Sequence, residues 1–329
     1  MTAPAPFDRW YPDAPVDGTY GYDRRALLDV VPADVPDGFA AFWRDEFDRA
    51  RATPADPVLV PLGDDGAHEI SRVEFTAADG LRLGGWVALP LGGAARAGVV
   101  HSHGYGGREF PDLARVPDDA AAIFPVARGL PALSSGRGAP SVNVEHVLHG
   151  IGSVRTYAVA RSAVDLWHAG SALCEIVDAP DGALPLYVVG KSFGGGVGAL
   201  AAPWDDRVVG TTLVVPSFGG HDLRLTMPCL GSGEAVRHHV ARHPEARRTL
   251  RWSDASAAAR YLRVPARVET VLWDTHVPPP GQFAIANAVP AHLLDLEIYP
   301  AGHAWYPGLS QDEAAAAAAT RAHVRATAG

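Results

Sequence analysis

The segment that most limits how this chain can fold is residues 186–196, LYVVGKSFGGG, where an apolar run passes directly into glycines. Residues 186–189 have the composition of a buried strand, and the small residues at 197–202 suit a helix. Between them Gly190 to Gly194 reads G-x-S-x-G, the pattern of a sharp strand-to-helix turn, or elbow, that strains its serine. The pattern makes Ser192 a candidate nucleophile, with an ordinary βα turn as the alternative.

A serine nucleophile needs a base and an acid that orients the base, and after such an elbow they follow in the order serine, acid, histidine. Residues 267–273 (RVETVLW) are predicted to form a buried strand that ends at Asp274. Residues 294–299 (LDLEIY) are predicted to form the next strand, which His303 follows. We therefore predict Asp274 as the acid and His303 as the base.

Other residues and other roles compete with this assignment. Asp295 lies inside the last strand and Asp254 in a polar segment, so both are poorer candidate acids, whereas Asp205 or Asp206 after the elbow helix stay open as alternatives. Asp274 could instead serve as a turn or capping residue before the prolines at 278–280, and His303 as an ordinary loop histidine.

The oxyanion of a tetrahedral intermediate needs two fixed hydrogen-bond donors. One is the backbone N–H of the residue after the nucleophile, which is Phe193. The other comes from the loop after an earlier strand, here predicted at 97–102, and the glycine-rich sequence at 103–107 (HGYGG) lets the backbone approach a substrate. We predict the Tyr105 N–H as the second donor and Gly104 as a substrate contact, with a simple glycine turn as the alternative.

No pattern in the sequence indicates a metal site. His101 and His103 lie on a predicted strand without a third ligand or a nearby carboxylate, and the histidines at 238–239 lie in a charged, helical segment. Two cysteines, Cys174 and Cys229, give neither a disulfide framework nor a zinc spacing, and we expect free thiols.

Composition and charge bound the class of protein. A chain of 329 residues that is 47% hydrophobic can bury a sizeable core, and we predict one structural domain. The net charge of −9 argues against a nucleic-acid partner, because no basic stripe is present to neutralise phosphates. The N-terminus lacks the pattern of a secretory signal and no apolar run approaches a membrane span, so we expect a cytoplasmic protein without a membrane partner.

The chain divides by pattern into an N-terminal part, residues 1–69, and an α/β part, residues 70–329. We predict an extended arm over 1–35 and a helix over 37–51 whose apolar face packs on the core. An antiparallel hairpin follows, with strands at 70–75 and 81–89.

From residue 97 onward predicted strands alternate with helices, which favours a mostly parallel central sheet with helices on both faces. Further predicted elements are a strand at 121–127, a long helix at 153–177, a strand at 208–215, an insertion at 217–264 before the acid-bearing strand, and a final helix at 311–327. Ser310 and Glu313 are predicted to open that last helix as a capping box.

These motifs together resemble the acetyl xylan esterase and cephalosporin C deacetylase family of α/β-hydrolases, of which this chain looks like a divergent member. The resemblance covers nearly the whole chain and is carried by Asp37, Phe39, Phe42 and Trp43; residues 103–107; Arg128 and Gly129; Tyr157; the elbow; residues 252–254 (WSD); Asp274 with Pro278, Pro279, Phe283, Ala284 and Asn287; and residues 299–303 (YPAGH). It implies an α/β-hydrolase fold, removal of acetyl groups from small sugars and related alcohols, and ring-like hexamers with enclosed active sites.

The chain departs from the family's pattern at three positions. The family usually has glutamine after the nucleophile, glutamine after Arg-Gly and glutamate after the catalytic histidine, whereas this chain has Phe193, Leu130 and Ala304. We expect a more apolar wall near the oxyanion hole, with Leu130 contacting substrate, and the specificity for acetyl groups on a sugar stays open. Arg128 is expected to be a structural ion-pair partner near the elbow.

The sequence thus predicts a serine carboxylester hydrolase that works through an acyl-enzyme and without metal or organic cofactor. Its expected partner is a small-molecule ester from which it removes an acetyl or other short acyl group, and by resemblance it forms a homo-oligomer, a hexamer. Two alternatives remain: a tailoring acyltransferase or cyclising hydrolase of secondary metabolism, and a catalytically silent α/β-hydrolase-like binding protein.

Overall fold

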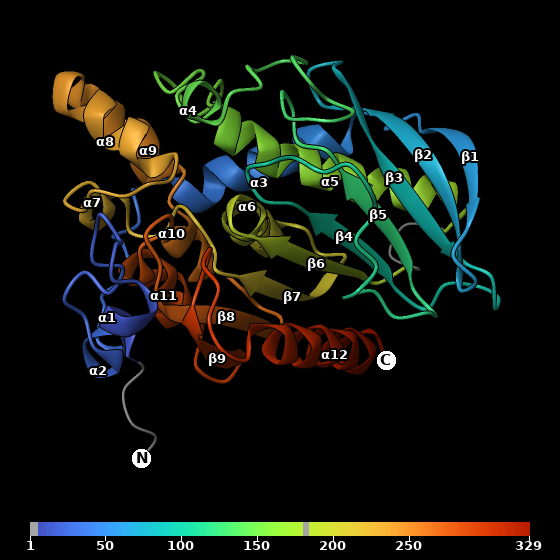
Figure 1. Cartoon of the computed structure of the whole chain (residues 1–329). Coiled ribbons are helices and arrows are strands. Elements are labelled where there is room, and N and C mark those ends of the chain that lie inside the picture. Colours follow the sequence, from blue (N-terminus) through green and yellow to red (C-terminus); the bar gives the residue numbers. More distant parts are fainter. Residues whose placement is uncertain (1–5, 180–183) are drawn as a thin grey trace.

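The computed structural model in Figure 1 describes residues 6–179 and 184–329. The strands are β1 (Val58–Asp64), β2 (His68–Thr76), β3 (Arg82–Pro90), β4 (Gly98–Ser102), β5 (Ala121–Pro125), β6 (Leu186–Lys191), β7 (Val208–Val214), β8 (Ala266–Trp273) and β9 (Leu294–Ala301). The α-helices are α1 (Phe7–Trp10), α2 (Arg24–Leu28), α3 (Phe39–Arg51), α4 (Asn143–His146), α5 (Ala158–Ile176), α6 (Phe193–Ala201), α7 (His221–Arg224), α8 (Gly233–Arg242), α9 (Arg247–Trp252), α10 (Ala255–Ala259), α11 (Pro279–Ala288) and α12 (Leu309–Ala328). The short 3-10 helices are η1 (Ala202–Trp204) and η2 (Pro244–Ala246).

The described strands form a nine-stranded sheet in the order β1-β2-β3-β5-β4-β6-β7-β8-β9. The strands from β1 through β3 to β5 pair antiparallel, and those from β5 through β4 and β6 to β9 pair parallel. Parallel neighbours need crossover connections, which α5, α6 and α11 supply. The predicted α/β class with a mostly parallel sheet is confirmed.

Side chains of a strand alternate between its two faces, so the sheet has an apolar layer on each face. Each layer packs against helices. Val188 of β6 belongs to the larger core, which also contains residues of α3, α5, α6 and α10. Its neighbours Tyr187 and Val189 face the other way and pack with Val324 of α12. Figure 1 shows α12 against one face of the sheet and α5 and α6 on the other.

The N-terminal part is more structured than the sequence suggested. The predicted helix is present as α3, and its Phe39 and Trp43 side chains are buried in the core. The arm before it is not simply extended, because it contains α1 and α2; its first five residues lie outside the described residues. Asp23 caps α2 by accepting a hydrogen bond from the Ala26 N–H, and Leu27 is buried next to α11.

The antiparallel hairpin is present as β2 and β3, and one further strand, β1, pairs with β2 at the edge of the sheet. Every residue of β1 is exposed, and Pro61 and Gly63 flank a register shift in it. Proline cannot donate a backbone hydrogen bond and is therefore tolerated at edge strands. The strand was not predicted because its sequence, VLVPLGD, contains a proline and a glycine.

The starts of α5 and α12 differ from the predictions. The long helix α5 begins at Ala158, because Tyr157 is still extended, rather than at residue 153. The final helix α12 begins at Leu309 after Gly308, whose φ of 98° is left-handed, so Ser310 already lies inside the helix and makes no cap hydrogen bond. The predicted capping box is therefore wrong.

The insertion between β7 and β8 contains α7, α8, α9 and α10. Residues of α7 and α8 line a cavity together with Ser192 at the carboxyl end of β6. Among the residues that the structure describes, no helix is both long and apolar enough to cross a membrane.

Candidate active site

The predicted elbow is confirmed as the junction of β6 and α6. Ser192 has φ 56° and ψ −114°, a strained conformation for a residue with a side chain. A Cβ atom on Gly190 would lie 2.2 Å from the Gly194 carbonyl oxygen, and one on Gly194 would lie 2.7 Å from the His103 carbonyl oxygen. The glycines are needed because the strand, the helix and the loop after β4 approach one another too closely for side chains.

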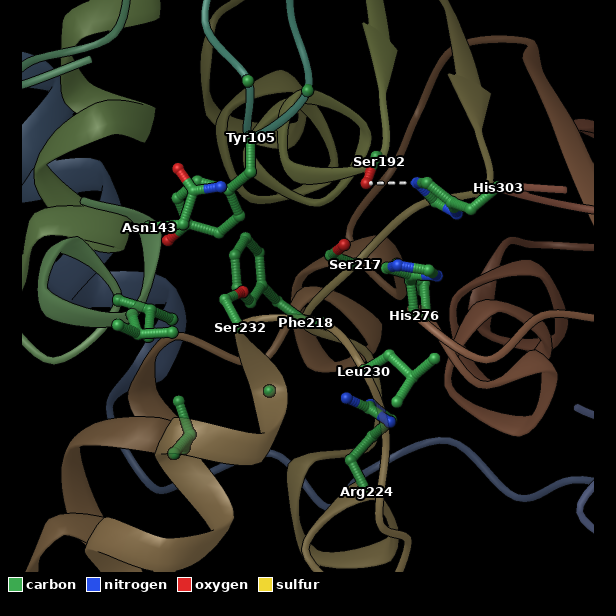
Figure 2. Close-up of a pocket in the computed structure, with 18 of the residues that line it drawn as sticks. Tyr105, Asn143, Ser192, Ser217, Phe218, Arg224, Leu230, Ser232, His276 and His303 are labelled. Atoms are coloured by element: carbon green, nitrogen blue, oxygen red, sulfur yellow. Dashed lines mark hydrogen bonds between the residues drawn. The ribbon is translucent and has the colours of Figure 1, made fainter. Parts of the chain in front are cut away.

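Ser192, His303 and Asp274 form a hydrogen-bonded chain. The Ser192 Oγ lies 3.0 Å from His303 Nε2, a contact drawn in Figure 2, and His303 Nδ1 lies 2.7 Å from Asp274 Oδ2. The three residues follow β6, β8 and β9, whose carboxyl ends meet at one edge because these strands run parallel. The structure thus brings together the three residues predicted as nucleophile, acid and base.

The Asp274 carboxylate is fully buried and held by four donors. Its Oδ1 accepts hydrogen bonds from the backbone N–H groups of His276 (2.8 Å) and Val277 (3.1 Å). Its Oδ2 accepts from His303 and, at 3.4 Å, from the Gln282 side-chain amide. Because an ionised carboxylate only accepts, the proton of neutral His303 belongs on Nδ1, and Nε2 is left to accept the serine proton.

The other candidate acids have different partners. Asp205 pairs with Arg207 at 2.7 Å, and Asp295 pairs with Arg267 at 2.6 Å. Asp254 accepts the Gly220 and His221 N–H groups and caps α10. Of these aspartates, only Asp274 is hydrogen-bonded to His303 in the described part of the chain.

Both predicted oxyanion donors belong to segments beside the serine. Phe193 is the first residue of α6, so its N–H has no partner inside the helix. The loop after β4 passes alongside, because a Cβ atom on Gly104 would lie 3.6 Å from the Ser192 Cβ. Gly104 and Tyr105 line the same cavity as Ser192.

Two buried histidines fix the loop after β4. His103 Nε2 accepts the Ala127 N–H at 3.0 Å, so its proton lies on Nδ1, 2.7 Å from the Gly104 carbonyl oxygen. His146 Nε2 lies 2.9 Å from the Arg128 carbonyl oxygen and therefore donates, and Nδ1 accepts the Tyr105 hydroxyl at 3.1 Å. The sequence offered no metal role for His103, and the structure gives it a positioning role.

These histidines are expected to make the folded protein sensitive to acid. Burial is the main cause that lowers the pKa of His103 to about 3 and the pKa of His146 to about 4. Unfolded histidines titrate near pH ~6.5, so below that pH the unfolded chain binds more protons and the free energy of unfolding falls. The stabilising contribution of the two neutral histidines is complete above pH ~6.5. It is lost as the pH falls from there through their folded pKa values.

His146→Gln should reduce the mean slope of unfolding free energy against pH by about 1 kcal/mol per pH unit between pH 5 and pH 6.5. Urea denaturation at four pH values across that window measures the slope. The exposed His243, replaced by glutamine, is the matched control and should leave the slope unchanged. Equal slopes for wild type and His146→Gln would contradict a neutral, buried His146.

The serine opens into a cavity of about 630 Å³. Figure 2 shows Ser192 and His303 on one side of it, with Ser217 and His276 next to them. Asn143 of α4 and Ser232 before α8 lie across from them. Sequence analysis missed these lining residues because no motif connects the insertion to the elbow, although His276 stands two positions after the predicted acid.

The expected contribution of Leu130 and the Phe193 side chain to the cavity wall is wrong. Both side chains are fully buried in the larger core. Phe193 points back from the start of α6 and packs against the ring of Tyr105, at 4.5 Å between ring centroids, and that of Phe218. The side chains of Phe193 and Leu130 therefore lie beneath the cavity wall, and Leu130 is a core residue and not a substrate contact.

Two further predictions can be compared with the structure. Arg128 pairs with Asp165 at 2.7 Å and Asp79 at 2.9 Å, which confirms a structural ion pair. Ala304 lines a separate cavity of about 350 Å³ on the other side of His303. No group of three or more histidine, cysteine or acidic residues arranged to hold a metal occurs in the described ranges.

A mostly parallel sheet with a serine elbow, followed in sequence by an acid and a histidine that converge on the serine, defines an α/β-hydrolase. The chain belongs to the acetyl xylan esterase family, whose sequence model matches residues 30–319. Membership of this family makes the protein a carboxylic ester hydrolase. A comparison with curated proteins finds no significant match.

Solved structures share the fold. An acetyl xylan esterase from Paenibacillus sp. R4 has a TM-score of 0.78 at 21% identity, over 91% of this chain and 99% of the other. Acetyl xylan esterase 1 from Thermoanaerobacterium sp. JW/SL YS485 has a TM-score of 0.77 at 18% identity, over 92% and 99%. The Pyrococcus furiosus esterase Pf2001 is more distant, with a TM-score of 0.54 at 13% identity, over 84% and 100%.

Proposed function

We propose that this protein is a serine esterase that removes acetyl or other short acyl groups from a sugar or another small alcohol. The observation that carries the proposal is the hydrogen-bonded chain from Ser192 through His303 to Asp274 at the wall of a cavity. The cavity volume of about 630 Å³ falls within the range of small-molecule sites. Two similar structures are of acetyl xylan esterases, which supports an acetylated sugar as substrate.

In the proposed first half-reaction, Ser192 Oγ attacks the carbonyl carbon of the ester while His303 Nε2 takes the hydroxyl proton. The tetrahedral oxyanion accepts hydrogen bonds from the backbone N–H groups of Phe193 and Tyr105. The carbon–oxygen bond to the alcohol then breaks, and His303 returns its proton to the leaving alkoxide. The products are the free alcohol and an acyl group on Ser192.

In the second half-reaction, water replaces the alcohol. His303 Nε2 takes a proton from water as its oxygen attacks the acyl carbon, and the proton returns to Ser192 Oγ when the ester bond to the enzyme breaks. Asp274 stays ionised throughout and stabilises the imidazolium. The strained Ser192 backbone keeps the hydroxyl projecting from the elbow during both half-reactions.

A series of 4-nitrophenyl esters tests this proposal. We expect hydrolysis of the acetate and butyrate, a sharp fall in kcat/KM beyond butyrate, and covalent labelling of Ser192 by a fluorophosphonate located by peptide mass spectrometry. A rate that peaks at octanoate would refute the short-acyl specificity. An intact protein that neither hydrolyses the acetate nor reacts with the fluorophosphonate would instead support the catalytically silent binding protein.

A homo-oligomer, with a hexamer implied by resemblance, remains a prediction for this chain. The edge strand β1 supports it, because Val58, Val60 and Leu62 are exposed on an unpaired sheet edge. Exposed apolar edge strands are surfaces on which another chain can pair.

A further inference from the structure

The cavity beside Ser192 is positively charged although the whole chain carries a net charge of −9. Its described lining contains Lys191, Arg224 and three histidines, and it contains neither aspartate nor glutamate. Lys191 is exposed and lies 3.8 Å from Glu313, so its charge has a partner. Arg224 is the other cation of this cavity, and its charge has no such partner in the described structure.

Arg224 has no acidic partner among the described residues. Its Nη1 atom is buried and has no hydrogen-bond partner, and its Nη2 atom lies 3.6 Å from the Cys229 sulfur. The nearby acids are occupied elsewhere: Asp222 pairs with Arg247 and Arg251, and Glu234 pairs with Arg237. Arg224 is partly buried, and a buried guanidinium nitrogen without a hydrogen-bond partner or counter-charge is costly, a cost that an anion within reach would relieve.

The Arg224 side chain is also held in place. A Cβ atom on Gly233 would lie 2.2 Å from Arg224 Nη2, and one on Gly281 would lie 2.7 Å from its Cδ, so the side chain fits between two glycines. The helix that carries it, α7, is anchored at its start by Asp254, which accepts the His221 N–H at 2.7 Å. Little conformational entropy is therefore lost when the guanidinium binds a ligand.

Figure 2 shows Arg224 across the cavity from Ser192, beyond Ser217 and His276 and next to Leu230. An anion that reaches Arg224 would thus be part of a molecule whose ester lies at Ser192. His221, the first residue of α7, also lines the cavity and has a buried Nε2 atom without a partner in the described chain. It offers a neutral nitrogen beside the cation.

We propose that Arg224 binds a carboxylate of the substrate, so that the preferred esters carry an anionic group remote from the bond that is cleaved. This inference rests on the proposed esterase function and adds the substrate's charge to it. A planar carboxylate matches the guanidinium because two parallel N–H donors can bind its two oxygens. The carboxylate can belong to the alcohol part or to the acyl part of the ester, and the experiment separates these sources.

The first test compares matched esters. On the alcohol side, 4-acetoxybenzoate is compared with its methyl ester, and on the acyl side 4-nitrophenyl hydrogen adipate is compared with 4-nitrophenyl methyl adipate. The measured quantity is the ratio of kcat/KM for the anionic ester to that for its neutral partner. We expect this ratio to be about ten or more in one of the two pairs.

Arg224→Gln should lower that ratio by about tenfold or more, to near one and chiefly through KM, and Arg224→Lys should restore part of it. Arg251→Gln is the matched control, since it removes one positive charge from an exposed position of the same insertion. It should leave both the ratio and the rate on 4-nitrophenyl acetate unchanged. A wild-type ratio near one in both pairs, or an unchanged ratio in folded Arg224→Gln, would overturn the proposal.

A second measurement does not depend on the Arg224 variants folding or on catalysis. Calorimetry with Ser192→Ala protein should show that adipate binds at least about tenfold more tightly than adipamide, its uncharged analogue. Equal or undetectable binding of both would refute the anion site. If wild type fails to hydrolyse any ester but adipate still binds selectively, the esterase proposal fails and the anion site stands.

Discussion

Replacing Ser192 by alanine is expected to lower kcat for 4-nitrophenyl acetate by about 10⁶, the loss found when the nucleophile of a triad is removed. The hydroxyl lies 3.0 Å from His303 Nε2, and alanine leaves neither a nucleophile nor a proton for the histidine to take. Single-turnover and steady-state rates of nitrophenolate release, read at matched protein concentrations, measure the loss. Fluorophosphonate labelling should disappear in the same variant.

The exposed Ser310 of α12, replaced by alanine, is the control for this experiment, because it takes no part in the hydrogen-bonded chain of Ser192, His303 and Asp274. Its kcat should equal that of the wild type. A Ser192→Ala protein that keeps more than about a hundredth of the wild-type kcat would show that another group attacks the ester.

Asp274→Asn is expected to lower kcat by about 10⁴ with little change in KM. The Oδ1 atom of Asp274 accepts two backbone N–H groups, so the amide oxygen of asparagine takes that position and the NH₂ group faces His303. The NH₂ then donates to His303 Nδ1 and forces the proton onto Nε2. An imidazole protonated at Nε2 cannot accept the Ser192 proton.

Nitrogen-15 NMR of the His303 ring can detect this tautomer directly, alongside kcat. The control is Asp206→Asn, which changes an exposed aspartate after the elbow helix and should leave kcat unchanged. A larger loss in Asp206→Asn than in Asp274→Asn would show that the acid is not Asp274, even though Ser192 could still be the nucleophile.

The parts of the site that local pattern determines could be predicted from sequence. The elbow depends on glycines within five residues, and Asp274 and His303 each directly follow a strand whose apolar run is legible. Once the strands pair in parallel, their carboxyl ends must meet, so residues 82 and 29 positions apart (274 − 192 and 303 − 274) come together. In a parallel sheet, residues that follow successive strands therefore lie close together in space.

The remaining features depend on tertiary contacts that no local pattern carries. Whether the Phe193 side chain enters the cavity or the core is decided by the rings of Tyr105 and Phe218, which come from other segments. The place of Arg224 in the cavity could not be predicted, because it depends on how α7 packs near a serine 32 positions earlier (224 − 192). The β1 strand depends on pairing with β2, since its own sequence contains a proline and a glycine.

The Asp274 backbone N–H donates to the Gly18 carbonyl oxygen at 3.0 Å, and the Tyr11 ring stacks on Trp273 at 3.8 Å between centroids. Asp274 is therefore braced by a residue that precedes it by 256 positions (274 − 18), while its partner His303 follows it by 29 (303 − 274). During synthesis the strand and elbow that carry Ser192 are made 111 residues before His303 (303 − 192). A nascent chain therefore cannot form the hydrogen-bonded chain from Ser192 to Asp274 before His303 has been synthesised.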